Sequence, residues 1–208
     1  MKTKAVLIVM VALIGFCFFA PIVSAETAEE WEVKGIDFLE WGEYEKAIEC
    51  YNKTIELDPN HTSAYNNRGL AYSDLMQYER AIEDYNKAIE LDANYTNAYN
   101  NRGLAYGNLK KYERAIEDYN KAIELDPNYV NVYYNRGNTY SDLMQYERAI
   151  EDYNKTIALD PNHTSAYYNR GNKYYNLMQY ERAIEDYNKT IELDPNYTSA
   201  YNNRGNAY

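Results

Sequence analysis

The chain has 208 residues and a net charge of −11, with 26 tyrosines but only two cysteines. A surface of this sign repels phosphate groups, which argues against nucleic-acid binding and against binding to anionic lipid head groups. If a leader carrying Lys2 and Lys4 is removed, the charge becomes more negative by two and Cys50 is the remaining cysteine, so no internal disulfide can form.

Residues 1–25 have the pattern of a secretory signal peptide. Lys2 and Lys4 precede an uncharged run, residues 5–23, and Ser24-Ala25 comes directly before Glu26. A basic start, an apolar run and a small-residue cleavage site are typical of an exported protein. The alternative is an uncleaved N-terminal membrane anchor, because the apolar run is nearly long enough to span a bilayer. Both interpretations place the rest of the chain outside the cytoplasm, either secreted or in the cell envelope.

From residue 28 onwards the chain repeats itself every 34 residues. The stretch that begins at Tyr65 returns almost unchanged at Tyr99, Tyr133, Tyr167 and Tyr201, and Trp31 begins a more divergent copy. A fixed period of this size predicts an array of structural units that stack on one another. The predicted units 1 to 5 are 28–61, 62–95, 96–129, 130–163 and 164–197, and residues 198–208 form the first helix of a partial sixth unit.

Each unit is predicted to be a pair of helices. In unit 2, Tyr65, Gly69 and Tyr72 fall on one stripe of a first helix, and Ala81 and Tyr85 fall on the stripe of a second. A glycine inside a helix costs about 1 kcal/mol, so its return in every unit predicts a close approach by a neighbouring helix. A threonine precedes the first stripe in most units, and these threonines are predicted N-caps: Thr62, Thr96, Thr164 and Thr198.

The period and these positions resemble the tetratricopeptide repeat, whose pattern is W-x2-L-G-x2-Y, then A-x3-F, then P. Unit 2 reads Tyr65-x-x-Arg68-Gly69-x-x-Tyr72, then Ala81-x3-Tyr85, and proline closes every unit except this one. The resemblance covers the chain from residue 28. It implies an all-α fold, a right-handed solenoid of stacked antiparallel helix pairs.

An arginine replaces the leucine of this pattern in unit 2 and every later unit. It lies beside the packing stripe, where a salt bridge to a second-helix carboxylate of the Glu83 or Asp84 type is the expected arrangement. Arginines used in this way are not free to hold an acidic peptide, which is one mode of binding in the family. The arginines are Arg68, Arg102, Arg136, Arg170 and Arg204.

The resemblance also implies that the first helices line a concave groove. An asparagine occupies one groove position in each unit after the first: Asn67, Asn101, Asn135, Asn169 and Asn203. Neighbouring groove positions add further candidates: Asn100, Tyr134, Tyr168, Asn138, Asn172 and Tyr175. An asparagine side chain has both a donor and an acceptor, so a ladder of them can hold the backbone of an extended peptide, as in certain family members. The alternative is that duplication copied the asparagines and left only a wettable surface.

The sequence contains no glycine-rich phosphate loop, nucleophile elbow or Cys/His cluster. The resulting prediction is a non-catalytic, exported scaffold without a cofactor, which binds a protein or an extended peptide in its groove. Two alternatives stay open: a structural spacer whose solenoid ends self-assemble, and an accessory fragment of a larger protein. The identity of the partner does not follow from the fold.

Overall fold

The computed structural model describes residues 26–208, and the predicted signal peptide lies outside these described residues. The described part of the chain contains eleven α-helices and no strand. The helices of units 1 to 5 are α1 (Ala28–Glu40) and α2 (Tyr44–Leu57), α3 (Thr62–Asp74) and α4 (Tyr78–Leu91), α5 (Thr96–Asn108) and α6 (Tyr112–Leu125), α7 (Val130–Asp142) and α8 (Tyr146–Leu159), and α9 (Thr164–Asn176) and α10 (Tyr180–Leu193), followed by α11 (Thr198–Ala207).

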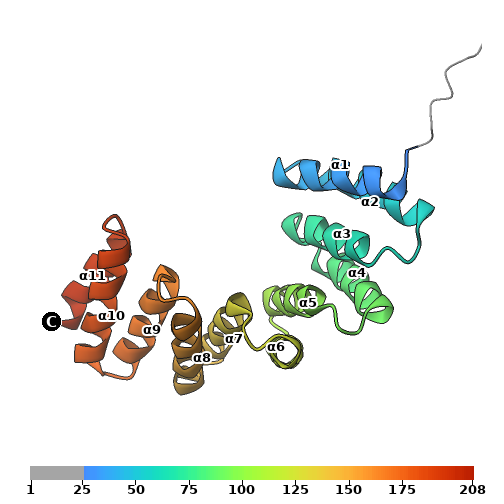
Figure 1. Ribbon diagram of the computed structural model, residues 1–208. Helices are drawn as coiled ribbons and strands as arrows, with labels where there is room; N and C mark the ends of the chain where they lie inside the picture. The colour runs from blue at the N-terminus through green and yellow to red at the C-terminus, as the bar shows by residue number, and fades with distance from the viewer. Residues whose placement is uncertain (1–25) are drawn as a thin grey trace, which may run out of the picture.

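The helix pairs stack into a solenoid that curves as an arc (Figure 1). Each helix packs against the next one along the chain, and α1, α3, α5 and α7 also touch in succession, as do α9 and α11. The first helices of the units follow the inner side of the arc and the second helices its outer side (Figure 1). The predicted all-α solenoid is confirmed. None of the helices α1 to α11 combines the length and apolar character that crossing a bilayer requires.

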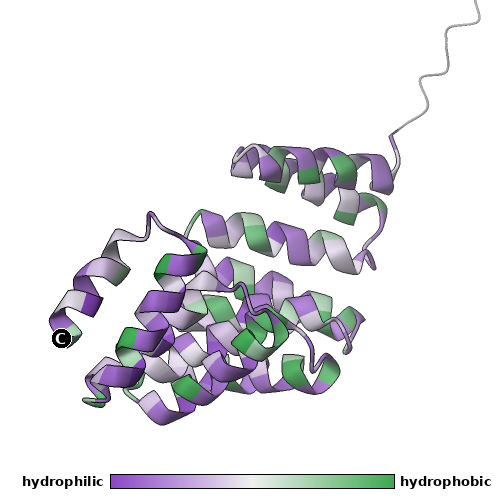
Figure 2. Ribbon diagram, turned by 60° about the vertical axis from the view of Figure 1, so that its left-hand side comes forward, coloured by the Kyte–Doolittle hydropathy of each residue, from purple (hydrophilic) through white to green (hydrophobic). Residues whose placement is uncertain are grey.

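Apolar and polar residues alternate along most of the helices (Figure 2), as expected where one face of each helix is covered by a neighbour. The core of each unit is a tyrosine of the second helix that lies over the glycine of the first. A Cβ atom on Gly69 would lie 2.6 Å from Tyr85 Cε1, and one on Gly171 would lie 2.9 Å from Tyr187 Cε1. Both tyrosines are only 1% exposed. Burial of the ring therefore offsets the helix-weakening effect of the glycine.

Four of the five arginines form the predicted salt bridge, with the Asp84-type residue as the carboxylate partner, whereas Arg204 bonds only to Asn188. Arg102 donates from Nε and Nη2 to Asp118 Oδ2 and Oδ1, at 2.8 and 2.6 Å. Its Nη1 donates to Asn86 Oδ1 at 2.6 Å. Asp118 belongs to the same unit, whereas Asn86 belongs to the second helix of the preceding unit, so one guanidinium ties three helices together. The same pattern recurs at Arg68, Arg136 and Arg170.

The N-cap prediction is wrong. The N-cap positions are occupied by His61, Tyr95, His163 and Tyr197, and each threonine is the first residue inside its helix. The turn between units explains the difference: Asp92 Oδ1 accepts from the N–H of Asn94 at 2.9 Å, while Thr96 Oγ1 donates to the Asn94 carbonyl at 3.4 Å. The aspartate that ends each second helix organises the turn, and the threonine hydroxyl is used there.

Candidate functional site

The predicted site residues all lie on first helices: Asn67 on α3, Asn100 and Asn101 on α5, Tyr134, Asn135 and Asn138 on α7, Tyr168, Asn169, Asn172 and Tyr175 on α9, and Asn203 on α11. Most of them are partly exposed, but Asn100 is only 5% exposed. Their side chains are not independent of one another, because hydrogen bonds link them from unit to unit. The pattern of these bonds differs between the two halves of the array.

In units 2 and 3 the asparagines form a continuous series of hydrogen bonds, which we call the amide chain. Asn66 Nδ2 donates to Asn67 Oδ1 at 3.1 Å, and Asn101 Nδ2 donates to Asn66 Oδ1 at 3.0 Å. Asn100 Nδ2 then donates to Asn101 Oδ1 at 3.1 Å, and Asn135 Nδ2 donates to Asn100 Oδ1 at 3.0 Å. The carbonyl oxygen of every amide in this chain except the last is occupied within the protein. These asparagines hold neighbouring first helices together.

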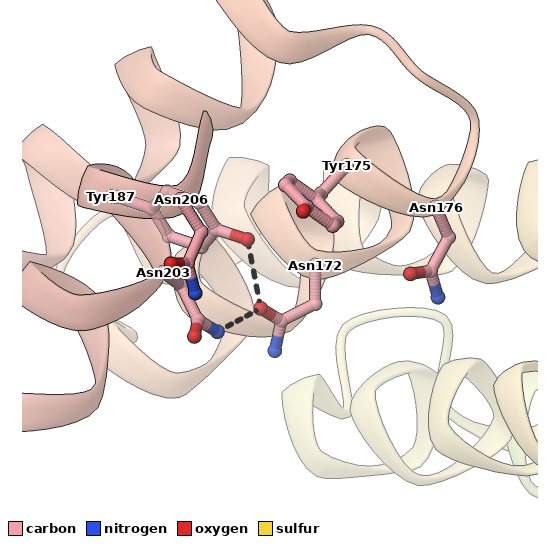
Figure 3. Close-up of a pocket in the computed structure, with 6 residues that line it drawn as sticks. All are labelled: Asn172, Tyr175, Asn176, Tyr187, Asn203 and Asn206. Carbon is pink, nitrogen blue, oxygen red and sulfur yellow. Dashed lines mark hydrogen bonds between the residues drawn. The ribbon is translucent and has the colours of Figure 1, made fainter. Parts of the chain in front are cut away.

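In unit 5 tyrosines take part in the network and leave some amide groups available. Asn203 Nδ2 donates to the Tyr168 hydroxyl at 3.0 Å and to Asn172 Oδ1 at 2.9 Å. Asn172 Oδ1 also accepts from the Tyr187 hydroxyl at 2.9 Å. Among the described residues, Asn172 Nδ2 and Asn203 Oδ1 have no hydrogen-bond partner. The amides of Asn172 and Asn203 therefore present an unused donor and an unused acceptor side by side (Figure 3).

Unit 4 has the same arrangement. Asn169 Nδ2 donates to the Tyr134 hydroxyl at 3.1 Å and to Asn138 Oδ1 at 3.0 Å, and the Tyr153 hydroxyl donates to Asn138 Oδ1 at 2.8 Å. Among the described residues, Asn138 Nδ2 and Asn169 Oδ1 have no hydrogen-bond partner. Two equivalent donor and acceptor pairs thus follow one another along the inner side of the arc.

Two hollows lie between first helices. The one between α9 and α11, here called the unit-5 pocket, has a volume of about 270 Å³ (Figure 3) and is lined by Asn172, Tyr175, Asn176, Tyr187, Asn203 and Asn206. The other, between α5 and α7, has about 210 Å³ and is lined by Leu104, Gly107, Asn108, Tyr119, Asn135, Asn138, Thr139 and Asp142. The structure therefore brings together Asn172, Tyr175 and Asn203 in one hollow, and Asn135 and Asn138 in another.

Sequence reasoning missed Asn176 and the second role of Tyr187. Asn176 lies one residue after Tyr175 at the end of α9, and no period in the sequence distinguishes it from a helix-terminal residue. Tyr187 was expected in the core, where its ring does lie, but its hydroxyl reaches the unit-5 pocket. Burial raises the pKa of Tyr187, so this hydroxyl stays neutral and remains a donor at physiological pH.

Unit 1 differs at the position of the arginine–aspartate pair. Lys34 and Cys50 stand where unit 2 has Arg68 and Asp84, and a hollow of about 470 Å³ opens there between Trp31 and Phe38. Burial raises the pKa of the Cys50 thiol, which keeps it protonated and unreactive near neutral pH. The described residues contain no cluster of side chains suited to hold a metal ion.

Comparison with known protein families identifies the repeats and their bounds. The model of the tetratricopeptide repeat matches residues 62–95, 96–129, 130–163 and 164–197, and a second model, described as a TPR repeat, matches residues 35–75. The tetratricopeptide repeat protein 36 homolog of Nematostella vectensis is 42% identical over 41 residues, which make up 20% of this chain and 23% of that protein. The chain therefore matches less than a quarter of the length of that relative.

Several solved structures have a similar fold. MamA is 28% identical with a TM-score of 0.71, and the alignment covers 79% of this chain and 96% of MamA. YrrB, described as a TPR protein with an unusual peptide-binding site, is 23% identical with a TM-score of 0.69 and coverages of 86% and 92%, which shows a shared fold. The first TPR of Spaghetti (RPAP3), solved with an HSP90 peptide bound, is 34% identical with a TM-score of 0.56 and coverages of 59% and 97%.

Proposed function

Because the chain belongs to the tetratricopeptide repeat family, we propose that it is a non-catalytic scaffold that holds an extended segment of a partner protein in the groove along its first helices. The observation that carries this proposal is two pairs of unused amide atoms between neighbouring first helices, Asn138 Nδ2 with Asn169 Oδ1 and Asn172 Nδ2 with Asn203 Oδ1. A donor next to an acceptor matches the C=O and N–H groups that an extended peptide presents along its backbone. Contacts of this kind do not depend on the peptide's sequence.

A protein partner also agrees with the similarity to the first TPR of Spaghetti, whose structure holds a peptide. The charges of the groove narrow the class of partner. Asp142 lines the hollow between α5 and α7, and the chain as a whole has a net charge of −11. An acidic segment would be repelled, so the partner segment is neutral or basic along most of its length.

Lys173, a cation on the first helix α9, is already engaged within the protein. Lys173 Nζ donates to Ser141 Oγ at 2.6 Å, and burial lowers the pKa of Lys173 although Asp142 opposes this shift. A lysine held in this way balances Asp142 and does not attract a partner's carboxylate. The segment is therefore bound through amide groups and tyrosine rings.

The proposed site of action is outside the cytoplasm, secreted or in the cell envelope, and this rests on the signal-peptide pattern of residues 1–25. The N-terminal sequence of the protein isolated from its source tests it. A mature chain that begins at Glu26 supports export with cleavage, and a chain that keeps residues 5–23 in the membrane fraction supports an anchor. An unprocessed chain in the soluble cytoplasmic fraction would contradict both.

Affinity capture with groove variants tests the proposed binding. Substitution of Asn101, Asn135 or Asn169 is unsuitable, because their Nδ2 groups donate to the preceding unit. We choose the double variant Asn138→Leu/Asn172→Leu: it also removes acceptors of this network, but the array already accommodates leucine at the same repeat position, at Leu70 and Leu104. The matched control is Glu151→Gln/Glu185→Gln, on exposed positions of α8 and α10 in the same two units.

A partner kept by the native chain and by the control but lost by the leucine variant supports the groove. Equal capture by all three contradicts it. Recovery of only the protein itself, with a mass in solution that rises with concentration, supports the self-assembling spacer instead.

A further inference from the structure

We infer that the unit-5 pocket selects a side-chain carboxamide, so that the bound segment places a glutamine or an asparagine there. This inference rests on the proposed function, because it assigns a preference to one place in the same groove. It starts from the residues of the pocket that break the repeat. Tyr175 stands where units 2, 3 and 4 have Ser73, Gly107 and Ser141.

Duplication accounts for residues that recur, and Tyr175 does not recur. The next position carries Asn176, where units 2 and 4 have the aspartates Asp74 and Asp142 and unit 3 has Asn108. Asn206 completes the lining, at the place that Asn138 holds in the hollow between α5 and α7, and Asn172 takes the place of Leu104. The combined result is a hollow bounded by four amides and two phenols, with no charged side chain in its lining.

A neutral polar lining excludes two classes of side chain. A carboxylate or an ammonium group would lose hydration in the pocket without meeting an opposite charge. An aliphatic side chain would displace water from Asn172 Nδ2 and Asn203 Oδ1 and leave both atoms unpaired, which is costly where water cannot replace the lost bonds. Both classes are therefore bound less well than a side chain that can pair with these atoms.

A carboxamide can form hydrogen bonds with both unused atoms of the pocket. Its carbonyl oxygen can accept from Asn172 Nδ2, and its NH₂ group can donate to Asn203 Oδ1, the two atoms that the internal network leaves over (Figure 3). Tyr175 is 36% exposed and packs edge-on against Tyr180, with ring centroids 5.3 Å apart. That contact holds the Tyr175 ring at the wall of the pocket, where one face can cover a flat amide group.

The test uses short alanine peptides that differ only in one central residue: glutamine, glutamate, lysine, leucine or alanine. Acetyl and N-methylamide caps remove terminal charges and avoid a terminal carboxamide. Binding to the intact chain is followed by nuclear magnetic resonance, through the side-chain NH₂ signals of Asn172 and Asn203. We expect the glutamine peptide to bind about tenfold more tightly than the glutamate and leucine peptides, which corresponds to about one unsatisfied hydrogen bond.

Tyr175→Ser/Asn176→Asp is the informative variant, because it gives the pocket the residues that unit 4 carries at Ser141 and Asp142. Both substituted residues are exposed and neither has a hydrogen bond to the amide network, so the fold is kept. The variant should lose the preference for glutamine, whereas Asn108→Asp, at the same repeat position in unit 3, should keep it.

Two other outcomes overturn the inference in different ways. If the glutamine and alanine peptides bind equally and Asn138→Leu/Asn172→Leu weakens both, the groove holds peptide backbone and the carboxamide preference is wrong. If no peptide shifts the Asn172 or Asn203 signals at millimolar concentration, the carboxamide site and the proposed groove are both wrong.

Discussion

Units 2 and 3 and units 4 and 5 have nearly the same sequence, yet they use the same asparagine differently. In units 2 and 3, Asn101 is held through both ends of its amide, by Asn66 and by Asn100. On α11, Asn203 uses only its Nδ2, towards Tyr168 and Asn172 of unit 5. The first region is joined by its amides, and the second presents part of them to the groove.

Two neighbouring positions account for this difference. Units 2 and 3 have asparagine and leucine where units 4 and 5 have tyrosine and asparagine: Asn66 and Leu70 compared with Tyr134 and Asn138. An asparagine neighbour donates back into the ladder and closes it, whereas a tyrosine hydroxyl accepts one bond and leaves the amide oxygen unused. A repeated residue can therefore have a structural role in one unit and an available surface in the next.

High pH should destabilise both regions alike, because each unit depends on one buried tyrosine ring of its second helix. Burial raises the pKa of Tyr85, Tyr119, Tyr153 and Tyr187 above the ordinary value of about 10. Their contribution to stability is complete below that value and is lost as the pH rises towards the folded-state pKa, since only unfolded chains then ionise these rings. We expect the free energy of unfolding to fall steeply above about pH 10, with tyrosinate absorbance rising as helical circular dichroism is lost. Full ionisation of an intact helical protein would contradict this.

Asn100→Leu should sharpen the comparison at the level of stability. Asn100 is nearly buried and bonds to Asn101 and to Asn135, so leucine would leave an acceptor and a donor unpaired. We expect a loss of about 2–3 kcal/mol in the free energy of unfolding, measured with urea. Tyr134→Phe, at the same repeat position in unit 4, removes a single acceptor and should cost about 1 kcal/mol. Equal losses would mean that the amide chain adds no stability of its own.

The tyrosine hydroxyls offer a smaller, paired test. The Tyr187 hydroxyl donates to Asn172, whereas the Tyr51 hydroxyl is buried without a hydrogen-bond partner among the described residues. Tyr187→Phe should therefore cost about 1 kcal/mol, while Tyr51→Phe should leave the free energy of unfolding unchanged or raise it slightly. Thermal or urea unfolding of both variants decides this. A larger cost at Tyr51 would show that its hydroxyl is bonded after all.

The smallest expected effect comes from making unit 3 resemble unit 5. In Leu104→Asn the new amide lies on the inner side of α5, in the hollow that Tyr119 and Asn135 also line. We expect stability to change by less than about 0.5 kcal/mol, because Leu104 is 39% exposed. Affinity for the all-alanine peptide should rise if the added amide extends the holding surface. Unchanged affinity would confine the binding surface to units 4 and 5.

Much of the fold could be predicted because its determinants lie within one period. The glycine, the tyrosine that covers it, and the arginine and its aspartate all recur at fixed spacing, so each unit repeats the same evidence. The N-cap prediction failed because each threonine lies one position inside its helix, and the Thr96 hydroxyl donates to the Asn94 carbonyl of the turn instead of capping the helix. The bonding of the asparagine ladder was also beyond prediction. Asn101 and Asn66 lie 35 residues apart, and their contact depends on the angle at which neighbouring units stack.

The three-helix tie made by Arg68, Arg102, Arg136 and Arg170 has a consequence for how the array opens. Arg68 donates a hydrogen bond to Asn52, which joins unit 2 to unit 1. Unit 1 itself has Lys34 and Cys50 at the positions of the arginine and the aspartate. The helices α1 and α2 are therefore not joined by an arginine–aspartate salt bridge. In a stack where each unit is stabilised by its neighbours, this makes unit 1 easier to open than units 2 to 5. Backbone amides of α1 should exchange with solvent hydrogen before those of α5, and opening should travel inward one unit at a time.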